Sequence, residues 1–299
     1  MADPNMFTAP FQLTKGMHRD VYAAVDPEAL ASNASGKVVL VTGASGGLGF
    51  AIAKAWAAAG AEGIIIVGRD RKNLEGAASE IGTKVPILVA AGSISNEADV
   101  QSIFAEAIKK FGRVDVVINS AGVANMDAAI GQVEPAVWWI DFETNVKGLY
   151  NVAHHFIKVN GGKGTFINLA TLGASFLVPA MSPYSASKLA AIKFLEYLDL
   201  EQPEMRVFSL HPGIVEAEGG RGGYVENFVP FAKDKQALSA GFTMYLQKPE
   251  ADYLRGGFVS VNWDVEEMEQ HKEEIIEGKL LKLAFLGAKL GPEGHPWKN

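Results

Sequence analysis

Short runs of apolar residues, many of them β-branched, recur along the chain. They are KVVLVT (37–42), GIIIV (63–67), VPILVA (85–90), VDVVIN (114–119), GTFINLA (164–170), MRVFSL (205–210) and GFVSVN (257–262). Continuous apolar runs of this length are typical of strands buried on both faces. In EADVQSIFAEAIKK (97–110), by contrast, apolar residues such as Val100, Ile103 and Ala107 recur at spacings of three and four, which predicts an amphipathic helix.

The alternation of strand and helix patterns predicts an α/β fold. We expect one doubly wound parallel sheet of about seven strands with helices on both faces, and ligands beyond the carboxyl ends of the strands. No repeat or low-complexity linker divides the chain. We therefore expect a single domain over residues 37–262, preceded by an arm (1–36) and followed by a tail (263–299).

Composition narrows the classes of function. The chain has 299 residues, 48% of them hydrophobic, a net charge of −7 and no cysteine. Without a basic cluster we expect no nucleic-acid partner, and without a long apolar run or a secretory pattern we expect a soluble, cytoplasmic protein with no membrane partner. The six histidines show no metal-binding spacing, so we expect no metal site.

The first predicted strand runs directly into the glycine-rich segment TGASGGLG (42–49). Gly43, Gly47 and Gly49 allow a tight turn and a close approach of the backbone to a pyrophosphate at the start of the following helix. Such a turn also occurs as a plain strand-to-helix connection. Its position after the first strand of an α/β pattern favours dinucleotide binding.

Tyr184 and Lys188 are four residues apart and share one face if their segment is helical. A phenol has a pKa near 10, and a neighbouring ammonium favours its ionised form. The pair therefore suits a general acid or base. The alternative is an exposed tyrosine and lysine on an amphipathic helix.

Five motifs in order resemble those of the short-chain dehydrogenase/reductase family. They are TGxxxGxG at 42–49, Asn119-Ser120-Ala121-Gly122 for NNAG, Asn145, YxxxK at 184–188, and His211-Pro212-Gly213. They cover residues 37 to about 217, and the arm and tail further resemble the roughly 300-residue members common in filamentous fungi. The resemblance implies a Rossmann-type fold and an NAD(P)-dependent enzyme acting on CH–OH or C=O groups.

The resemblance implies a catalytic set of Asn145, Thr171, Tyr184 and Lys188. Tyr184 would exchange the proton, and Lys188 would supply positive charge and bind the nicotinamide ribose. Thr171 stands thirteen residues before the tyrosine, where the family usually has serine. Its hydroxyl can still donate to a carbonyl oxygen. The alternative is that Thr171 only packs after its strand and that Ser175 or Ser182 donates instead.

The expected cofactor contacts follow from the same motifs. They are Gly43, Ser45, Gly47, Leu48, Gly49, Arg69, Ser93, Ile94, Asn119, Ala121, Gly122, Tyr184, Lys188, Pro212, Gly213 and Val215. Three positions depart from the family pattern. Ser93 replaces a common aspartate, Ser120 replaces the second asparagine of NNAG, and Ala217 replaces a threonine that commonly contacts the carboxamide.

The end of the second predicted strand bears on the choice of cofactor. An acidic residue there would bind the ribose 2′-hydroxyl, but the sequence has Gly68 followed by Arg69. A guanidinium can pair with a 2′-phosphate. We therefore expect NADP(H) rather than NAD(H). The alternative is that Arg69 is a surface residue before a helix capped by Asp70.

The loop at 215–235 contains several glycines and the aromatic residues Tyr224, Phe228 and Phe231. In the family such a segment covers the substrate. We expect an NADP(H)-dependent oxidoreductase that acts on a bulky, largely apolar carbonyl compound or the corresponding secondary alcohol. The alternative is the same fold without net redox chemistry, as an isomerase, dehydratase, cyclase or NADP(H)-binding sensor.

The helix predicted after Tyr184 is apolar around more of its circumference than one sheet contact requires. Family members commonly pair through this helix and the one that carries Asn145. We expect a homodimer or homotetramer. The alternative is burial beneath the arm or tail of the same chain.

Overall fold

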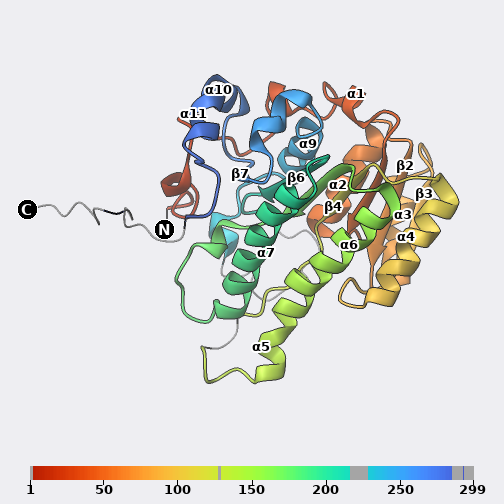
Figure 1. Ribbon diagram of the computed structural model, residues 1–299, viewed down its shortest axis with the longest axis horizontal. Coiled ribbons are helices and arrows are strands. Elements are labelled where there is room, and N and C mark those ends of the chain that lie inside the picture. The colour runs from red at the N-terminus through yellow and green to blue at the C-terminus, as the bar shows by residue number, and fades with distance from the viewer. Residues whose placement is uncertain (1–2, 127–128, 216–227, 285–291, 293–299) are drawn as a thin grey trace, which may run out of the picture.

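A computed structural model describes residues 3–126, 129–215, 228–284 and 292. Its centre is one parallel seven-stranded sheet with the strand order β3-β2-β1-β4-β5-β6-β7 (Figure 1). The strands are β1 (Val38–Thr42), β2 (Gly63–Gly68), β3 (Ile87–Ala91), β4 (Val116–Asn119), β5 (Gly164–Leu169), β6 (Met205–His211) and β7 (Phe258–Ser260). Each lies within or at the edge of a predicted run, so the predicted α/β class and strand number are confirmed.

Helices cover both faces of the sheet. They are α1 (Ala31–Ala34), α2 (Gly47–Ala58), α3 (Arg71–Ile81), α4 (Glu97–Phe111), α5 (Pro135–Phe142), α6 (Leu149–Asn160), α7 (Ser182–Glu201), α9 (Gln236–Tyr245), α10 (Val265–Gln270) and α11 (Lys272–Glu277). In Figure 1, α6 and α7 lie in front of the sheet, and α5 extends beyond its lower edge. None of the helices within the described ranges is long and apolar enough to cross a membrane.

The core explains why the strands read as continuous apolar runs. Side chains of β1 alternate between the two faces: Val39 and Val41 join a cluster with α2, α3 and α9, whereas Val38 and Leu40 join a cluster with α4, α6 and α7. All five residues of β1 are buried. A parallel sheet covered on both faces has no polar side to expose.

The N-terminal arm packs closely against the rest of the chain. Met17 pairs with Trp263 as an antiparallel bridge, and a side chain on Gly241 of α9 would collide with the carbonyl oxygen of Val25. The backbone of Lys15 donates to Glu267 of α10. In Figure 1 the red N-terminal segment accordingly lies beside the blue helices α10 and α11.

Candidate active site

A cleft of about 980 Å³ opens at the carboxyl ends of the strands. It is lined by residues that directly follow six of them: Gly43 after β1, Arg69 after β2, Gly92 after β3, Ser120 after β4, Ala170 after β5 and Pro212 after β6. The strand order reverses at β1, which has β2 on one side and β4 on the other. Ligands of open α/β sheets bind at this kind of switch point.

The glycine-rich segment between β1 and α2 forms a backbone cradle. Gly43 has φ +67°, and a Cβ there would lie 2.9 Å from the Cα of Ala121. A Cβ on Gly49 would lie 2.5 Å from the carbonyl oxygen of Gly43, so α2 packs directly on the turn. Gly46 and Gly47 line the cleft and have open space where a Cβ would be. The cradle and the start of α2 therefore fit a pyrophosphate.

Most of the predicted cofactor contacts do line the cleft. They are Gly43, Ser45, Gly47, Leu48, Arg69, Ser93, Ile94, Ala121, Gly122, Tyr184, Pro212, Gly213 and Val215. Gly49, Asn119 and Lys188 are not among the lining residues. These three lie behind the wall of the cleft and support it.

Asn119 illustrates this supporting position. Its Oδ1 accepts a hydrogen bond from the hydroxyl of Thr42 at 2.8 Å, and its Nδ2 donates to Oδ1 of Asn168 at 2.8 Å. The backbone N–H of Ala121 donates to the Thr42 hydroxyl at 3.0 Å. Asn119 thus links the carboxyl ends of β1, β4 and β5, and it fixes the turn that faces the cleft.

Thr171 and Tyr184 lie next to Gly173 in the wall of the cleft. A Cβ on Gly173 would lie 3.2 Å from Oγ1 of Thr171 and 3.5 Å from Cε1 of Tyr184. Both residues line the cleft, whereas Ser175 and Ser182 do not. The hydroxyl of Ser175 donates to the carbonyl of Leu172 at 2.8 Å, and that of Ser182 accepts from Trp138 at 3.1 Å. Of Thr171, Ser175 and Ser182, only Thr171 lines the cleft.

Asn145 and Lys188 lie together behind Gly122. A Cβ on Gly122 would lie 3.1 Å from Oδ1 of Asn145 and 3.3 Å from Nζ of Lys188. Asn145 belongs to a π-helical segment, η3 (Glu143–Gly148), that joins α5 to α6. Its side chain bonds both the N–H and the C=O of Val123, at 3.0 and 2.9 Å. Of the four predicted catalytic residues, Thr171 and Tyr184 line the cleft, whereas Asn145 and Lys188 lie behind its wall.

Lys188 is one helical turn beyond Tyr184 on α7, as the spacing predicts. Its Nζ lies 6.0 Å from the centroid of the Tyr184 ring and donates to the carbonyl of Leu169 at 2.9 Å. Burial lowers the pKa of Lys188 to about 8, and the charge of Asp141 opposes this shift. The ammonium is still mostly charged at neutral pH.

Asp141 is a neighbour of the site that we did not predict from the sequence. It is fully buried one helical turn before Asn145 and accepts hydrogen bonds from the backbone and side chain of Asn125. Burial raises the pKa of Asp141, while the bonds from Asn125 and the charge of Lys188 lower it. A single acid within the apolar run WWIDF, four residues before Asn145, was the available signal.

The adenosine end of the candidate cofactor site carries two cations. Arg69 and Lys72 both line the cleft, and Gly68 leaves no acidic side chain at the end of β2. Asp70 caps α3 by accepting from the N–H of Asn73 at 2.9 Å. The expected cap is therefore present together with the cleft-facing arginine. Lys72, which we also did not predict, lies in the first turn of α3, three residues after Arg69.

The segment after β6 is described only in part. Val215 lines the cleft and bridges to Asp234, and Phe228 and Phe231 are described at the far end of the predicted substrate loop. Tyr224 and Ala217, and with them most of that loop, lie outside the described residues. Their expected roles stay predictions.

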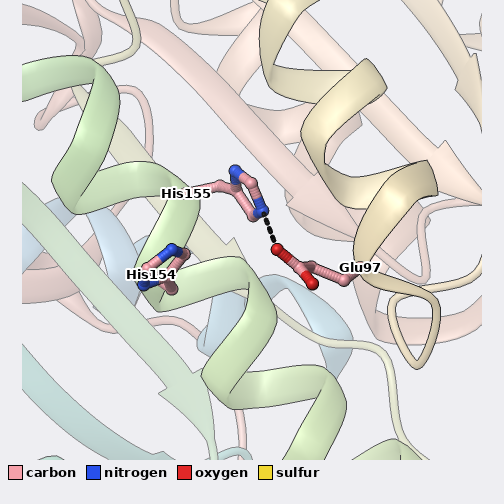
Figure 2. A group of neighbouring side chains, drawn as sticks. All are labelled: Glu97, His154 and His155. Atoms are coloured by element: carbon pink, nitrogen blue, oxygen red, sulfur yellow. Dashed lines mark ion pairs between the residues drawn. The ribbon is translucent and has the colours of Figure 1, made fainter.

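A group of possible metal ligands lies apart from the residues that line the cleft. Glu97 at the start of α4 and the consecutive residues His154 and His155 of α6 have ligand atoms within 4.8 Å of one another (Figure 2). Nε2 of His155 is 3.6 Å from Oε1 of Glu97, and burial lowers the pKa of His155. None of the three lines the cleft. Sequence spacing did not indicate this group because Glu97 comes from a distant helix.

Comparisons with known proteins show the family of the chain. The chain is 31% identical over 297 residues to the short chain dehydrogenase pigC of Monascus ruber, covering 95% of this chain and 97% of the relative. A 3-ketoacyl-(acyl-carrier-protein) reductase from Brucella melitensis, solved with NADH, superposes with a TM-score of 0.68 at 30% identity, over 76% of this chain and 97% of its own.

A second structure supports the fold alone. The actinorhodin polyketide ketoreductase with NADPH superposes with a TM-score of 0.68 at 24% identity, over 76% of this chain and 95% of its own. The short chain dehydrogenase family profile matches residues 37–222. The chain therefore belongs to the short-chain dehydrogenase family of NAD(P)-dependent oxidoreductases.

Proposed function

We propose that the protein is an NADP(H)-dependent oxidoreductase that reduces a bulky, largely apolar carbonyl compound or oxidises the corresponding secondary alcohol. The observation that carries the proposal is that Thr171 and Tyr184 line the cleft next to Gly173, where a Cβ would lie 3.2 Å from Oγ1 of Thr171 and 3.5 Å from the ring carbon Cε1 of Tyr184. Two hydroxyl-bearing side chains close together in the cleft suit a carbonyl oxygen.

Each of the two hydroxyls has a distinct role. Oγ1 of Thr171 accepts a hydrogen bond from the N–H of Gly173 at 3.0 Å, which orients the hydroxyl so that its own proton can be donated into the cleft. It polarises the carbonyl as negative charge develops on the oxygen. Tyr184 transfers its phenolic proton to that oxygen, or accepts a proton from the alcohol in the reverse direction. A bound nicotinamide would supply or receive the hydride at the carbonyl carbon.

Lys188 and Asn145 act from behind the wall of the cleft. The Lys188 ammonium, held by the carbonyl of Leu169, favours the phenolate that Tyr184 becomes after donating its proton. Asn145 fixes the backbone of Val123, which lines the cleft. The residues that hold the cofactor are the glycine cradle at 43–49, Gly122 and the turn at Pro212 and Gly213.

The preference for NADP(H) is supported by charge. Arg69 and Lys72 line the cleft where the ribose of the adenosine would lie, and either can pair with a 2′-phosphate. We expect Arg69→Ala to weaken NADPH binding while leaving NADH binding nearly unchanged. Lys37→Ala, at the start of the domain and outside the residues that line the cleft, is the matched control for loss of one positive charge. Equal NADPH affinity in wild type and Arg69→Ala would contradict the assignment.

The test of the reaction is oxidation of NADPH, followed by nicotinamide absorbance, with a panel of ketones and quinones. Tyr184→Phe should lose roughly a hundredfold to ten-thousandfold in turnover while cofactor affinity is kept. Thr171→Ala should lose about a hundredfold, and Thr171→Ser should retain most activity. Lys188→Ala should also weaken NADPH binding.

Two results would change the proposal. If Tyr184→Phe turns over like the wild type, the proton comes from another group. If the wild type binds NADPH tightly but oxidises none of it across the panel, the non-redox alternative is favoured.

A further inference from the structure

Three phenylalanine rings from distant segments meet in the wall of the cleft. Phe7, Phe176 and Phe228 all line it. The ring centroid of Phe7 lies 5.7 Å from that of Phe176 and 5.7 Å from that of Phe228. Phe231 packs edge-on against Phe7 from behind at 4.8 Å, and Phe11 lies 4.9 Å from Phe176. We call Phe7, Phe176 and Phe228 the aromatic wall.

The aromatic wall lies at the reacting end of the cleft. Phe176 follows Thr171 by five residues after β5, and Phe228 lies beyond β6. These strands are three and four positions from β2 in the sheet, and every charged side chain among the described lining residues (Arg69, Lys72 and Glu80) lies just after β2 or on α3. The described lining at the catalytic end is therefore uncharged.

The N-terminal arm supplies Phe7, and hydrogen bonds hold it in place. The carbonyl of Asn5 accepts the N–H groups of Thr8 and Ala9, which closes a turn around Phe7. Nη2 of Arg19 donates to Oδ1 of Asn5 at 2.7 Å, and Nη1 of Arg19 pairs with Oδ1 of Asp234 at 3.0 Å. The turn is thus tied to a side chain of the main domain.

Asp234 connects this anchor to the cleft itself. Its carboxylate is fully buried and also accepts the backbone N–H of Ile214 and, at 2.8 Å, Nδ2 of Asn262. Ile214 directly follows the turn at Gly213 on the cofactor side. One buried carboxylate therefore holds both the arm that carries Phe7 and the turn after β6.

We propose that the aromatic wall is a substrate subsite that binds the planar ring system of an aryl ketone, with Phe7 of the N-terminal arm as its specificity-determining residue. The proposal rests on the proposed function for the carbonyl chemistry. The three cleft-lining rings are only partly buried, so a flat apolar ring would cover them. Offset or edge-to-face pairs contribute about 0.5–1.5 kcal/mol beyond the area they bury, which a saturated ring of equal size does not gain.

The test compares two ketones of the same skeleton, acetylnaphthalene and its saturated counterpart acetyldecalin. We expect Phe7→Leu, which keeps apolar volume but removes the ring, to lower the ratio of kcat/KM for the aryl over the saturated ketone about two- to tenfold. Phe11→Leu is the matched control, because Phe11 touches Phe176 but does not line the cleft, and it should leave the ratio unchanged. Asn5→Ala, which removes the side-chain hydrogen bond between the turn and Arg19, should change the ratio in the same direction as Phe7→Leu.

Equilibrium binding of both ketones to the full chain saturated with NADP⁺ separates the two proposals. If wild type binds the aryl ketone more tightly and Phe7→Leu loses that preference, the subsite stands even when neither ketone is reduced, and only the proposed reaction fails. If Phe7→Leu folds and keeps the wild-type preference in both turnover and binding, the subsite is refuted while the reaction stands. The subsite is also refuted if Phe7→Leu folds and weakens the binding of both ketones equally, because a purely apolar wall predicts that result.

Discussion

Replacing Asp141 with asparagine tests whether the buried carboxylate sets the protonation of Lys188, which we propose assists Tyr184. Asparagine keeps the volume, and the amide of Asn125 can turn to preserve the side-chain hydrogen bond, so the variant mainly removes one negative charge near Lys188. Asp141 raises the pKa of the Lys188 ammonium, so loss of its negative charge should lower that pKa further.

The magnitude follows from the pKa of Lys188, which burial lowers to about 8. In the proposed mechanism, carbonyl reduction requires the charged ammonium of Lys188 and the neutral phenol of Tyr184, so kcat/KM for reduction should fall above about pH 8 in the wild type. A nearby opposite charge shifts the pKa of an ionisable group by about one unit or more. With a pKa one unit lower in Asp141→Asn, the active fraction would fall about twofold at pH 7 and about fivefold at pH 8.

The assay is the pH dependence of kcat/KM for NADPH-dependent reduction of one accepted ketone, with folding checked by circular dichroism. Asn125→Ala is the matched control. It removes the side-chain hydrogen bond to Asp141 but keeps the carboxylate. The fall of kcat/KM at high pH should therefore not move to lower pH. If kcat/KM falls at the same high pH in Asp141→Asn and in the wild type, the charge of Asp141 does not affect the protonation of Lys188. If the pH profiles of Asp141→Asn and Asn125→Ala shift by the same amount, Asp141 acts only by holding the backbone around Asn125.

Three further predictions concern the cradle, the oligomer and the metal-ligand group. Gly43→Ala places a side chain at φ +67°, with its Cβ 2.9 Å from the Cα of Ala121. The free energy of unfolding in urea should fall by about 1–2 kcal/mol or more, and an unchanged urea midpoint would contradict the tight turn. Light scattering should give the molar mass of a dimer or tetramer for the wild type and a smaller mass for Tyr197→Arg, because the apolar ring of Tyr197 on α7 is 53% exposed. A monomer mass for the wild type at micromolar concentration would refute this. Carbonyl reduction should survive dialysis against EDTA, because in the proposed mechanism Tyr184 and Thr171 provide the acid and the hydrogen bond; loss of activity that Zn²⁺ restores would instead implicate Glu97 and its histidine neighbours.

The local pattern of the sequence determined the fold and much of the site. A buried parallel strand must be apolar on both faces, so the runs that became β1 to β7 stand out without knowledge of their neighbours. The glycine-rich turn and the spacing of Tyr184 and Lys188 are also local features, since a turn and one helical repeat fix their geometry. These are the features for which sequence and structure agree most closely.

Only the tertiary structure decided which side chains face the cleft and which lie behind it. Asn119 ends strand β4, where a ligand-binding residue is expected, yet its amide bonds Thr42 and Asn168 on the neighbouring strands. Phe7 reaches the cleft through contacts between Arg19 and Asp234, more than 200 residues apart along the chain. Asp141 matters because packing brings α5 against α7. Contacts of this kind depend on how distant elements pack, and no short-range periodicity in the sequence encodes them.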